Sequence, residues 1–194
     1  MVERRAVNNQ TQKLLDFVPA NSQILREKCR ELSLEEIRST EIQKLIDDLF
    51  YTVENSSRGV GLSANQIGRK EAISVVATKP TPARPNLEIF NKVFINPKII
   101  RTFGEKKPMW EGCLSTAVDE NGESAMAQVP RYEKIQIEYL DQDGRENCEV
   151  VDGFIAHVLQ HEIDHLNGIL FTDLINANDM VSYQEYIRRN NGTV

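Results

Sequence analysis

Residues 160–168, which read QHEIDHLNG, constrain this chain more than any other segment because they contain the pattern H-E-x-x-H. Residues four apart lie on one face of an α-helix, so His161 and His165 can bind one metal ion together. Glu162 follows the first of them, where its carboxylate can act as a general base toward an attacking water. The pattern therefore predicts a metal-binding helix in a hydrolase. A surface helix that carries two solvated histidines is the alternative reading of these residues.

A hydrolytic metal site with two histidines needs a third protein ligand and one open position. In a metzincin the third ligand is a histidine six residues after the second, but that position holds Phe171. A thermolysin-like site would take a glutamate from a later helix, and Glu185 is such a residue. A thiolate is the third option, and Cys113 lies in the segment EGCLS. The residue types alone leave both Glu185 and Cys113 as candidates.

Three short segments resemble the motifs of peptide deformylases, in the order typical of that family. They are GVGLSANQ at residues 59–66, EGCLS at 111–115 and HEIDH at 161–165. The resemblance extends over roughly residues 20–175, which is most of the chain. It implies an α+β domain in which antiparallel β-sheets surround a central metal-binding helix. It also implies a metal-dependent hydrolase that removes the N-formyl group from the N-terminal methionine of newly made proteins and releases formate.

The resemblance also implies a role for each motif residue. The metal ligands are Cys113, His161 and His165, and Glu162 is the general base. The oxyanion is stabilised by the side-chain amide of Gln66 and the backbone N–H of Leu114, donors of a kind worth about 3 kcal/mol each. The family implies Fe²⁺ as the ion, with Zn²⁺, Ni²⁺ or Co²⁺ also able to occupy the site, and mixed thiolate and imidazole ligation suits either iron or zinc.

By the same resemblance, the substrate methionine lies in a pocket lined by Val60, Met109, Phe154, His157 and Val158, and the Gly61 backbone pairs with the substrate chain. Core packing is an equal alternative for Phe154 and Val158. His157 stands where bacterial members carry an apolar residue, one helical turn before His161. Three successive turns extend over about 12 Å and cannot all reach one ion, so His157 is expected to be a pocket or packing residue.

Two further expectations concern the surroundings of the site. Glu111 is expected to pair with Arg131 and so support the Cys113 loop. Met126 holds a position where the family often has an arginine near the substrate backbone, which leaves substrate preference open. A non-catalytic relative with a purely structural metal would need a fourth protein ligand such as His157, and would not need Gln66 or Glu162.

Composition agrees with a cytoplasmic enzyme. The 194 residues include 40% hydrophobic and 27% charged residues, which fits one globular domain. Cys29 and Cys148 remain as free thiols, a pattern that suits a reducing compartment. The net charge of −6 argues against nucleic-acid binding, and no apolar run is long enough to cross a membrane. The expected partners are N-formylmethionyl nascent peptides, with weak docking to the ribosome, and a monomer is favoured.

The chain divides into an N-terminal extension (1–20), a catalytic domain (21–176) and a C-terminal helix and tail (177–194). Ser33 and Glu36 are spaced as a helix-capping box. Hydrophobic spacing predicts helices at 11–17, 42–53, 153–166 and 177–189, and strands at 72–77, 93–95, 98–103, 135–139 and 146–151.

Overall fold

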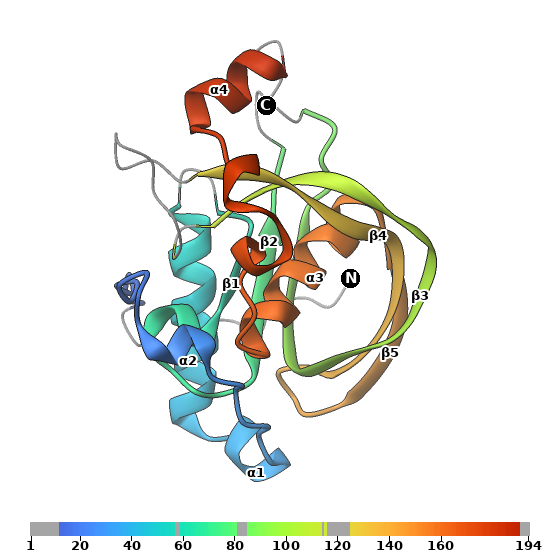
Figure 1. Cartoon of the computed structure of the whole chain (residues 1–194). Helices are drawn as coiled ribbons and strands as arrows, with labels where there is room; N and C mark the ends of the chain where they lie inside the picture. Colours follow the sequence, from blue (N-terminus) through green and yellow to red (C-terminus); the bar gives the residue numbers. More distant parts are fainter. Residues whose placement is uncertain (1–11, 57–58, 81–84, 114, 116–124, 191–194) are drawn as a thin grey trace.

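The computed structural model describes residues 12–56, 59–80, 85–113, 115 and 125–190. Its sheet has five strands in the order β1-β2-β3-β4-β5, and every neighbouring pair is antiparallel. The strands are β1 (Gly61–Ser63), β2 (Ile73–Thr78), β3 (Phe90–Gly112), β4 (Met126–Leu140) and β5 (Glu146–Asp152). The predicted strands at 93–95 and 98–103 are parts of the single strand β3. Irregularities in its pairing with β4 bend both strands, and Figure 1 shows β3, β4 and β5 curling around one helix.

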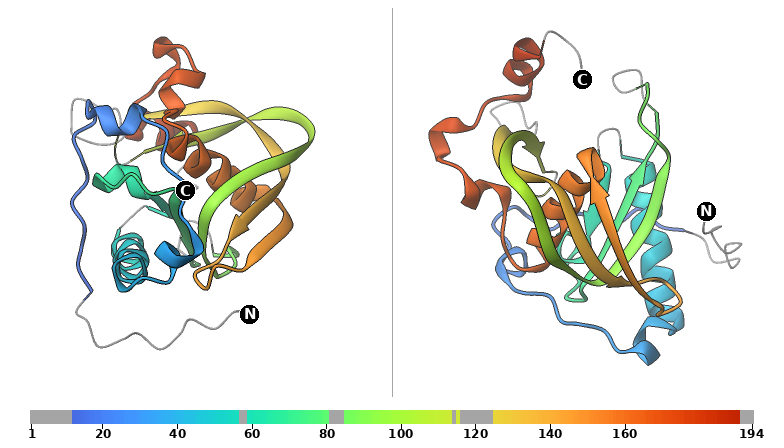
Figure 2. Two further views of the ribbon diagram at one scale, coloured as in Figure 1. Left: turned by 90° about the horizontal axis from the view of Figure 1, so that it is seen from below. Right: turned by 90° about the vertical axis from the view of Figure 1, so that its right-hand side faces the viewer.

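That enclosed helix is α3 (Gly153–Leu166), which has the bounds predicted from the metal motif. It contacts all five strands, and Figure 2 shows it between the curled strands and the β1–β2 side of the sheet. Ala156 and Leu159 are fully buried against Phe94, Ile135 and Ile137. The expected α+β fold, with antiparallel strands around a central helix, is confirmed.

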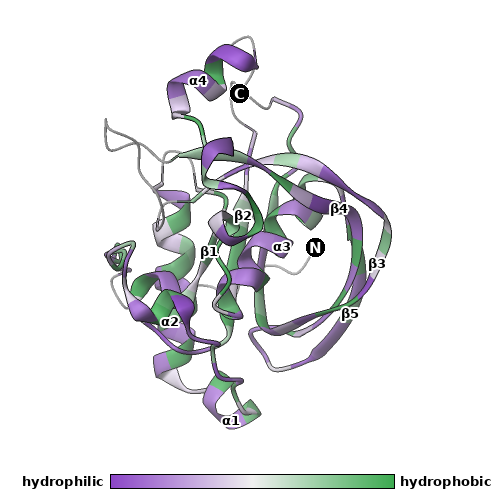
Figure 3. Ribbon diagram, in the orientation of Figure 1, coloured by the Kyte–Doolittle hydropathy of each residue, from purple (hydrophilic) through white to green (hydrophobic). Residues whose placement is uncertain are grey.

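Helix α2 (Thr40–Glu54) packs on β1 and β2 and forms a second apolar core. It confirms the amphipathic helix predicted from residues 42–53. The short helix α1 (Leu34–Ile37) precedes it, and the predicted capping box is present between Ser33 and Glu36. Figure 3 shows hydrophobic and polar residues interspersed along α2, and its buried hydrophobic residues belong to the core against β1 and β2. The described residues also form four short 3₁₀ turns: η1 (Gln23–Arg26), η2 (Ala64–Ile67), η3 (Phe171–Leu174) and η4 (Ala177–Asp179).

The helix predicted at residues 11–17 is wrong for residues 12–17, the described part of that range, which contain no helix. The backbone N–H of Lys13 donates to Asp48 Oδ1 at 3.0 Å, and that of Leu15 donates to Thr52 Oγ1 at 3.1 Å. The segment therefore lies along α2 and bonds to its side chains instead of to its own carbonyls.

The last predicted helix, at 177–189, is interrupted. It divides into η4 and the helix α4 (Tyr183–Arg189). Between them Val181 exchanges two backbone hydrogen bonds with Met126, of 2.9 and 2.8 Å, and forms an isolated β-bridge. The bridge fixes the C-terminal segment beside the start of β4, close to the end of β3. None of the helices in the described ranges is long and apolar enough to cross a membrane.

Candidate metal centre and active site

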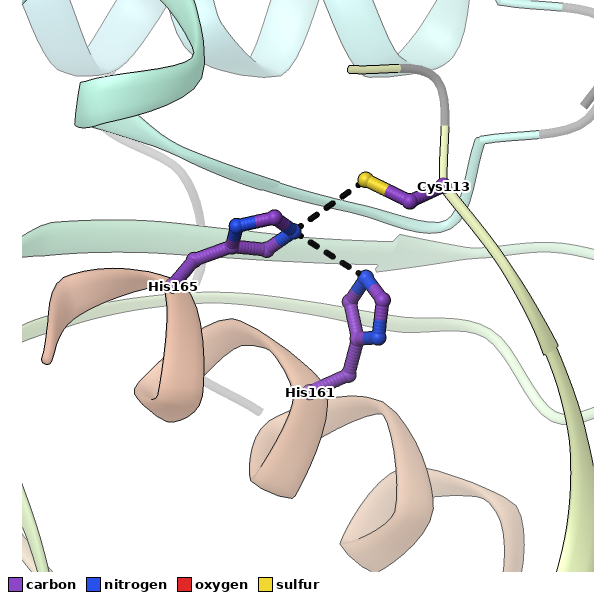
Figure 4. Close-up of side chains that lie close together, drawn as sticks. All are labelled: Cys113, His161 and His165. Carbon is purple, nitrogen blue, oxygen red and sulfur yellow. Dashed lines mark hydrogen bonds between the residues drawn. The ribbon is translucent and has the colours of Figure 1, made fainter. Parts of the chain in front are cut away.

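The side chains of Cys113, His161 and His165 converge at one point (Figure 4). Cys113 directly follows β3, and the two histidines lie one turn apart on α3. Nε2 of His165 is 3.2 Å from the Cys113 sulfur and 3.2 Å from Nε2 of His161, and all three donor atoms lie within 4.8 Å of one another. In a tetrahedral site with ligand bonds of 2.0–2.3 Å, ligand atoms are about 3.3–3.6 Å apart. The donor set therefore fits a divalent metal ion.

Glu185, the rival third ligand, does not take part in this group. It lies on α4, and its carboxylate pairs with Arg188 and Arg189. These ion pairs hold the pKa of Glu185 low, at about 2. The thiolate option is therefore the one that the geometry supports.

The electrostatics around Cys113 favour the thiolate form that metals bind. Burial alone would raise the pKa of the Cys113 thiol, but the neighbouring rings of His165 and His161 hold it well below its usual value. Burial would likewise lower the pKa of His161, yet contacts with Cys113 and Glu111 hold it above the ordinary value. A metal ion bound at this point would replace the ring protons as the positive charge beside the thiolate.

The Glu111 carboxylate orients the His161 ring through a hydrogen bond. Its Oε2 lies 2.8 Å from His161 Nδ1, so it accepts from the ring nitrogen that does not face the metal group. Arg131 donates to both oxygens of Glu111, from Nε at 2.6 Å and Nη2 at 3.1 Å, and its Nη1 bonds to Asp164. The predicted Glu111–Arg131 pair is therefore confirmed.

His157 adds a further donor to Glu111. Its Nε2 lies 2.9 Å from Oε1 of that carboxylate. A carboxylate can only accept, so this nitrogen carries the proton. The ring also packs edge-on against Phe154, with centroids 6.2 Å apart. His157 is thus not part of the ligand group, and it supports the group through Glu111.

Glu162 is buried beside the ligands. Its Oε2 accepts a 2.6 Å hydrogen bond from the Ser63 hydroxyl. Burial raises the pKa of Glu162 above its ordinary value, against the opposing effect of His161 and His165. A Cβ on Gly61 would lie 2.4 Å from Glu162 Oε1, so a larger residue at this position of β1 would push the carboxylate out of its place. A buried carboxylate with raised proton affinity suits a general base.

Gln66 is held with its amide nitrogen toward the ligands. Its Oε1 accepts from the Ser63 backbone N–H at 2.8 Å, which fixes the orientation of the amide. Its Nε2 then lies 3.0 Å from Ser115 Oγ and 3.4 Å from the Cys113 sulfur. Leu114, the other expected oxyanion donor, lies outside the described residues.

Of the expected pocket residues, Val60, Phe154 and Val158 share one apolar cluster, whereas Met109 lies apart from them on β3. Val60 and Phe154 are half-buried and pack against the apolar cluster that contains Val158, while Gly61 pairs with Val76 in the sheet. Met109 is half-buried on β3 opposite Val129, four residues before Cys113. Met126 is also half-buried, and its sulfur would lie 2.5 Å from a Cβ at Gly112, so it packs closely against the residue before Cys113.

Sequence reasoning missed several supporting residues. Ser63 bonds to Glu162, Asn65 donates to the His165 backbone carbonyl at 2.6 Å, and Asp164 pairs with Arg131. All three are polar residues inside the GVGLSANQ and HEIDH motifs. Their position within a motif was the available signal, because a polar residue on a buried segment needs a partner.

Comparisons with known proteins agree with this geometry. The sequence model of the polypeptide deformylase family matches residues 14–180. Peptide deformylase 2 of Nostoc sp. is 34% identical over 92% of this chain and 97% of its own, and the peptide deformylase of Rhizobium meliloti is 40% identical over 73% and 76%.

Solved structures give the same result. The class I type b peptide deformylase from Acinetobacter baumannii with bound Met-Ala-Ser superposes with a TM-score of 0.77, at 31% identity over 85% of this chain and 100% of that one. A peptide deformylase from Synechococcus elongatus in complex with actinonin has a TM-score of 0.73, at 30% identity over 98% and 94%. The chain therefore belongs to the peptide deformylase family.

Proposed function

We propose that Cys113, His161 and His165 hold the metal with which this hydrolase removes the N-formyl group from the N-terminal methionine of newly made proteins. The observation that carries the proposal is the convergence of these three donors beside the buried Glu162 carboxylate. Such a three-ligand set leaves one coordination position open for chemistry.

The protein groups divide the hydrolysis among them. A divalent ion held by Cys113, His161 and His165 would supply a Lewis acid for the formyl carbonyl and would lower the pKa of an attacking water. Glu162 takes a proton from that water as its oxygen bonds to the formyl carbon. The Gln66 amide and the Leu114 backbone N–H donate to the carbonyl oxygen as it becomes negative. The C–N bond then breaks, and Glu162 passes its proton to the departing amine, which yields formate and a free N-terminus.

For the ion we propose Fe²⁺, with Zn²⁺, Ni²⁺ and Co²⁺ as able substitutes, because thiolate with two imidazoles suits these metals. If Fe²⁺ occupies the site, we expect the protein to lose activity in air. We further propose that the methionine side chain binds among Val60, Met109, Phe154, His157 and Val158. The Acinetobacter baumannii relative was solved with Met-Ala-Ser bound, which is the peptide that deformylation of formyl-Met-Ala-Ser would leave.

The proposed setting follows from the substrate. The formylated ends of nascent chains arise at the ribosome, so we propose that the protein acts in the cytoplasm as a monomer that docks weakly near the ribosome. Residues 1–20 act as an extension of a catalytic domain at 21–176, and residues 177–194 as its C-terminal helix and tail.

The test is formate release from formyl-Met-Ala-Ser by protein prepared without oxygen and loaded with Fe²⁺ or Ni²⁺. Acetyl-Met-Ala-Ser is the matched control, because it differs only in the acyl group. We expect formate from the first peptide and no acetate from the second. Cleavage of the Met–Ala bond would instead indicate a peptidase, and intact peptides with a fully metal-loaded protein would indicate a structural metal site.

A further inference from the structure

Ser63 lies between the two groups that the proposed hydrolysis assigns to proton transfer and oxyanion binding. Its backbone N–H donates to Gln66 Oε1 at 2.8 Å, and its hydroxyl donates to Glu162 Oε2 at 2.6 Å. Ser63 is fully buried. One residue of β1 therefore sets the position of both a catalytic amide and a catalytic carboxylate.

The hydroxyl of Ser74 completes this arrangement. Ser63 and Ser74 are direct cross-strand partners in the β1–β2 pair, and their Oγ atoms are 2.7 Å apart. A hydroxyl has one proton, and an ionised carboxylate can only accept. The Ser63 hydroxyl donates to Glu162, whose Oε2 and backbone carbonyl oxygen, 3.0 Å from Ser63 Oγ, can both only accept, so Ser74 must be the donor to Ser63. Ser74 therefore donates to Ser63 and Ser63 donates to Glu162, because the carboxylate at the end of this series can only accept.

The two carboxylate oxygens of Glu162 have different surroundings. Oε2 is held by Ser63, while Oε1 lies against the bare Cα of Gly61, where a Cβ would approach to 2.4 Å. The Ser63 hydroxyl thus holds Oε2, and Gly61 leaves the space that Oε1 occupies. A general base must be held close to the proton that it removes, and a misplacement of about 1 Å can cost 100-fold in rate.

We propose that Ser63, oriented by Ser74, is a positioning residue for Glu162: it anchors Oε2 so that Oε1 is the oxygen that takes the proton of the attacking water. The inference rests on the proposed role of Glu162 as the base. It assigns no metal-binding role to either serine, so metal content must be independent of both hydroxyls.

The test compares Ser63→Ala and Ser74→Ala with the wild type, each loaded with Ni²⁺. We expect kcat for formyl-Met-Ala-Ser to fall about 10- to 100-fold in Ser63→Ala and about 3-fold in Ser74→Ala, with KM and bound metal unchanged. Thr52→Val is the matched control, because Thr52 is a buried residue whose hydroxyl bonds to Asp48 and Leu15 on the far side of the sheet. It should leave kcat unchanged even if it lowers the melting temperature.

A double-mutant cycle shows whether Ser63 acts through Glu162. In a Glu162→Asp background the carboxylate is withdrawn from Ser63, so adding Ser63→Ala should change kcat by less than about twofold. An unchanged kcat in Ser63→Ala, a loss that merely follows lost metal, or the full loss in the Glu162→Asp background would each overturn the inference. If Ser63→Ala does not fold, an unchanged kcat in Ser74→Ala overturns it. A wild type that releases no formate would instead reject the proposed function.

Discussion

Two glutamates of this protein, Glu111 and Glu71, are held in nearly the same way and serve different ends. Each is buried, and each accepts two hydrogen bonds from one arginine: Glu111 from Arg131 at 2.6 and 3.1 Å, and Glu71 from Arg69 at 3.0 and 2.9 Å. The pKa of both carboxyls is lowered against the effect of burial: that of Glu71 chiefly by Arg69, and that of Glu111 by His157 and His161 and then by Arg131. The pairing with arginine alone does not distinguish the two glutamates.

The other hydrogen-bond partners of Glu111 and Glu71 distinguish the two glutamates. Glu111 also accepts from His161 and His157, and so orients a proposed metal ligand. Glu71 Oε1 instead lies 3.5 Å from Arg30 Nη2, and Arg69 Nη2 also lies 2.7 Å from Oε1 of Glu41 on α2. This network of ion pairs therefore joins separate segments of the chain. A carboxylate–guanidinium pair holds both side chains in place and so orients the other residues that bond to them. Changes at Glu111 should therefore appear in metal binding, and changes at Glu71 in stability.

The largest difference is expected from Glu111→Gln. A neutral amide keeps the shape of the side chain but places an N–H₂ group where donors of Arg131 or His161 now point. We expect metal affinity to fall about 10- to 100-fold, as is common for residues that orient a metal-bound histidine. Competition with a chromogenic chelator measures this, and Glu71→Gln is the matched control with unchanged affinity. Equal affinity in both variants would remove the distinction between the two glutamates.

Glu71→Gln should act on folding instead. The side chain of Arg69 is 34% exposed and can regain water, so the loss is moderate. We expect the free energy of unfolding at pH 7 to decrease by about 1–2 kcal/mol. Urea unfolding of the metal-loaded protein measures it, and formate release per bound metal should stay at the wild-type value. A variant as stable as the wild type would contradict a structural role for this network.

The same pair predicts a pH dependence. The folded pKa of Glu71 lies below its ordinary value of 4.5, chiefly because Arg69 donates to the carboxylate. The folded state thus binds this proton more weakly than the unfolded state, so the contribution of Glu71 is fully present above pH 4.5 and is lost as pH falls through the folded pKa. The difference in unfolding free energy between wild type and Glu71→Gln should therefore shrink as pH falls from 6 toward 3. A difference that is constant over that range would exclude the ion pair as its source.

The smallest effect is expected at His157. Arg131 still clamps Glu111 when His157 is replaced, so His157→Ile should lower metal affinity by only about 3-fold, well below the effect of Glu111→Gln. The chelator competition that measures Glu111→Gln applies here too. A loss as large as that of Glu111→Gln would mean that His157, and not Arg131, determines the position of Glu111.

The sequence predicted the parts of this molecule that depend on local spacing. Helix α3 follows from the four-residue spacing of His161 and His165 together with its apolar residues, and α2 from the period of its buried side chains. The choice of Cys113 over Glu185 needed the resemblance, because no local pattern reports a contact between residues 52 apart, such as that of Cys113 with His165.

The errors have the same origin. Residues 12–17 are not helical, and the N–H groups of Lys13 and Leu15 bond to side chains of α2. The C-terminal helix is interrupted where Val181 pairs with Met126. The contact of Ser63 with Glu162 could not be predicted because the two residues are 99 positions apart in the sequence. Propensity describes a segment in isolation, whereas each of these features depends on a distant partner.

The most direct test of the account measures bound metal and formate release together in Cys113→Ala and Glu162→Gln. We predict that Cys113→Ala, prepared anaerobically with Fe²⁺ or Ni²⁺, loses both the metal and the activity. Glu162→Gln should keep one equivalent of metal while its release of formate from formyl-Met-Ala-Ser falls about 100- to 10,000-fold, the range lost with a general base. A full equivalent of metal in Cys113→Ala, or wild-type formate release by Glu162→Gln, would contradict it.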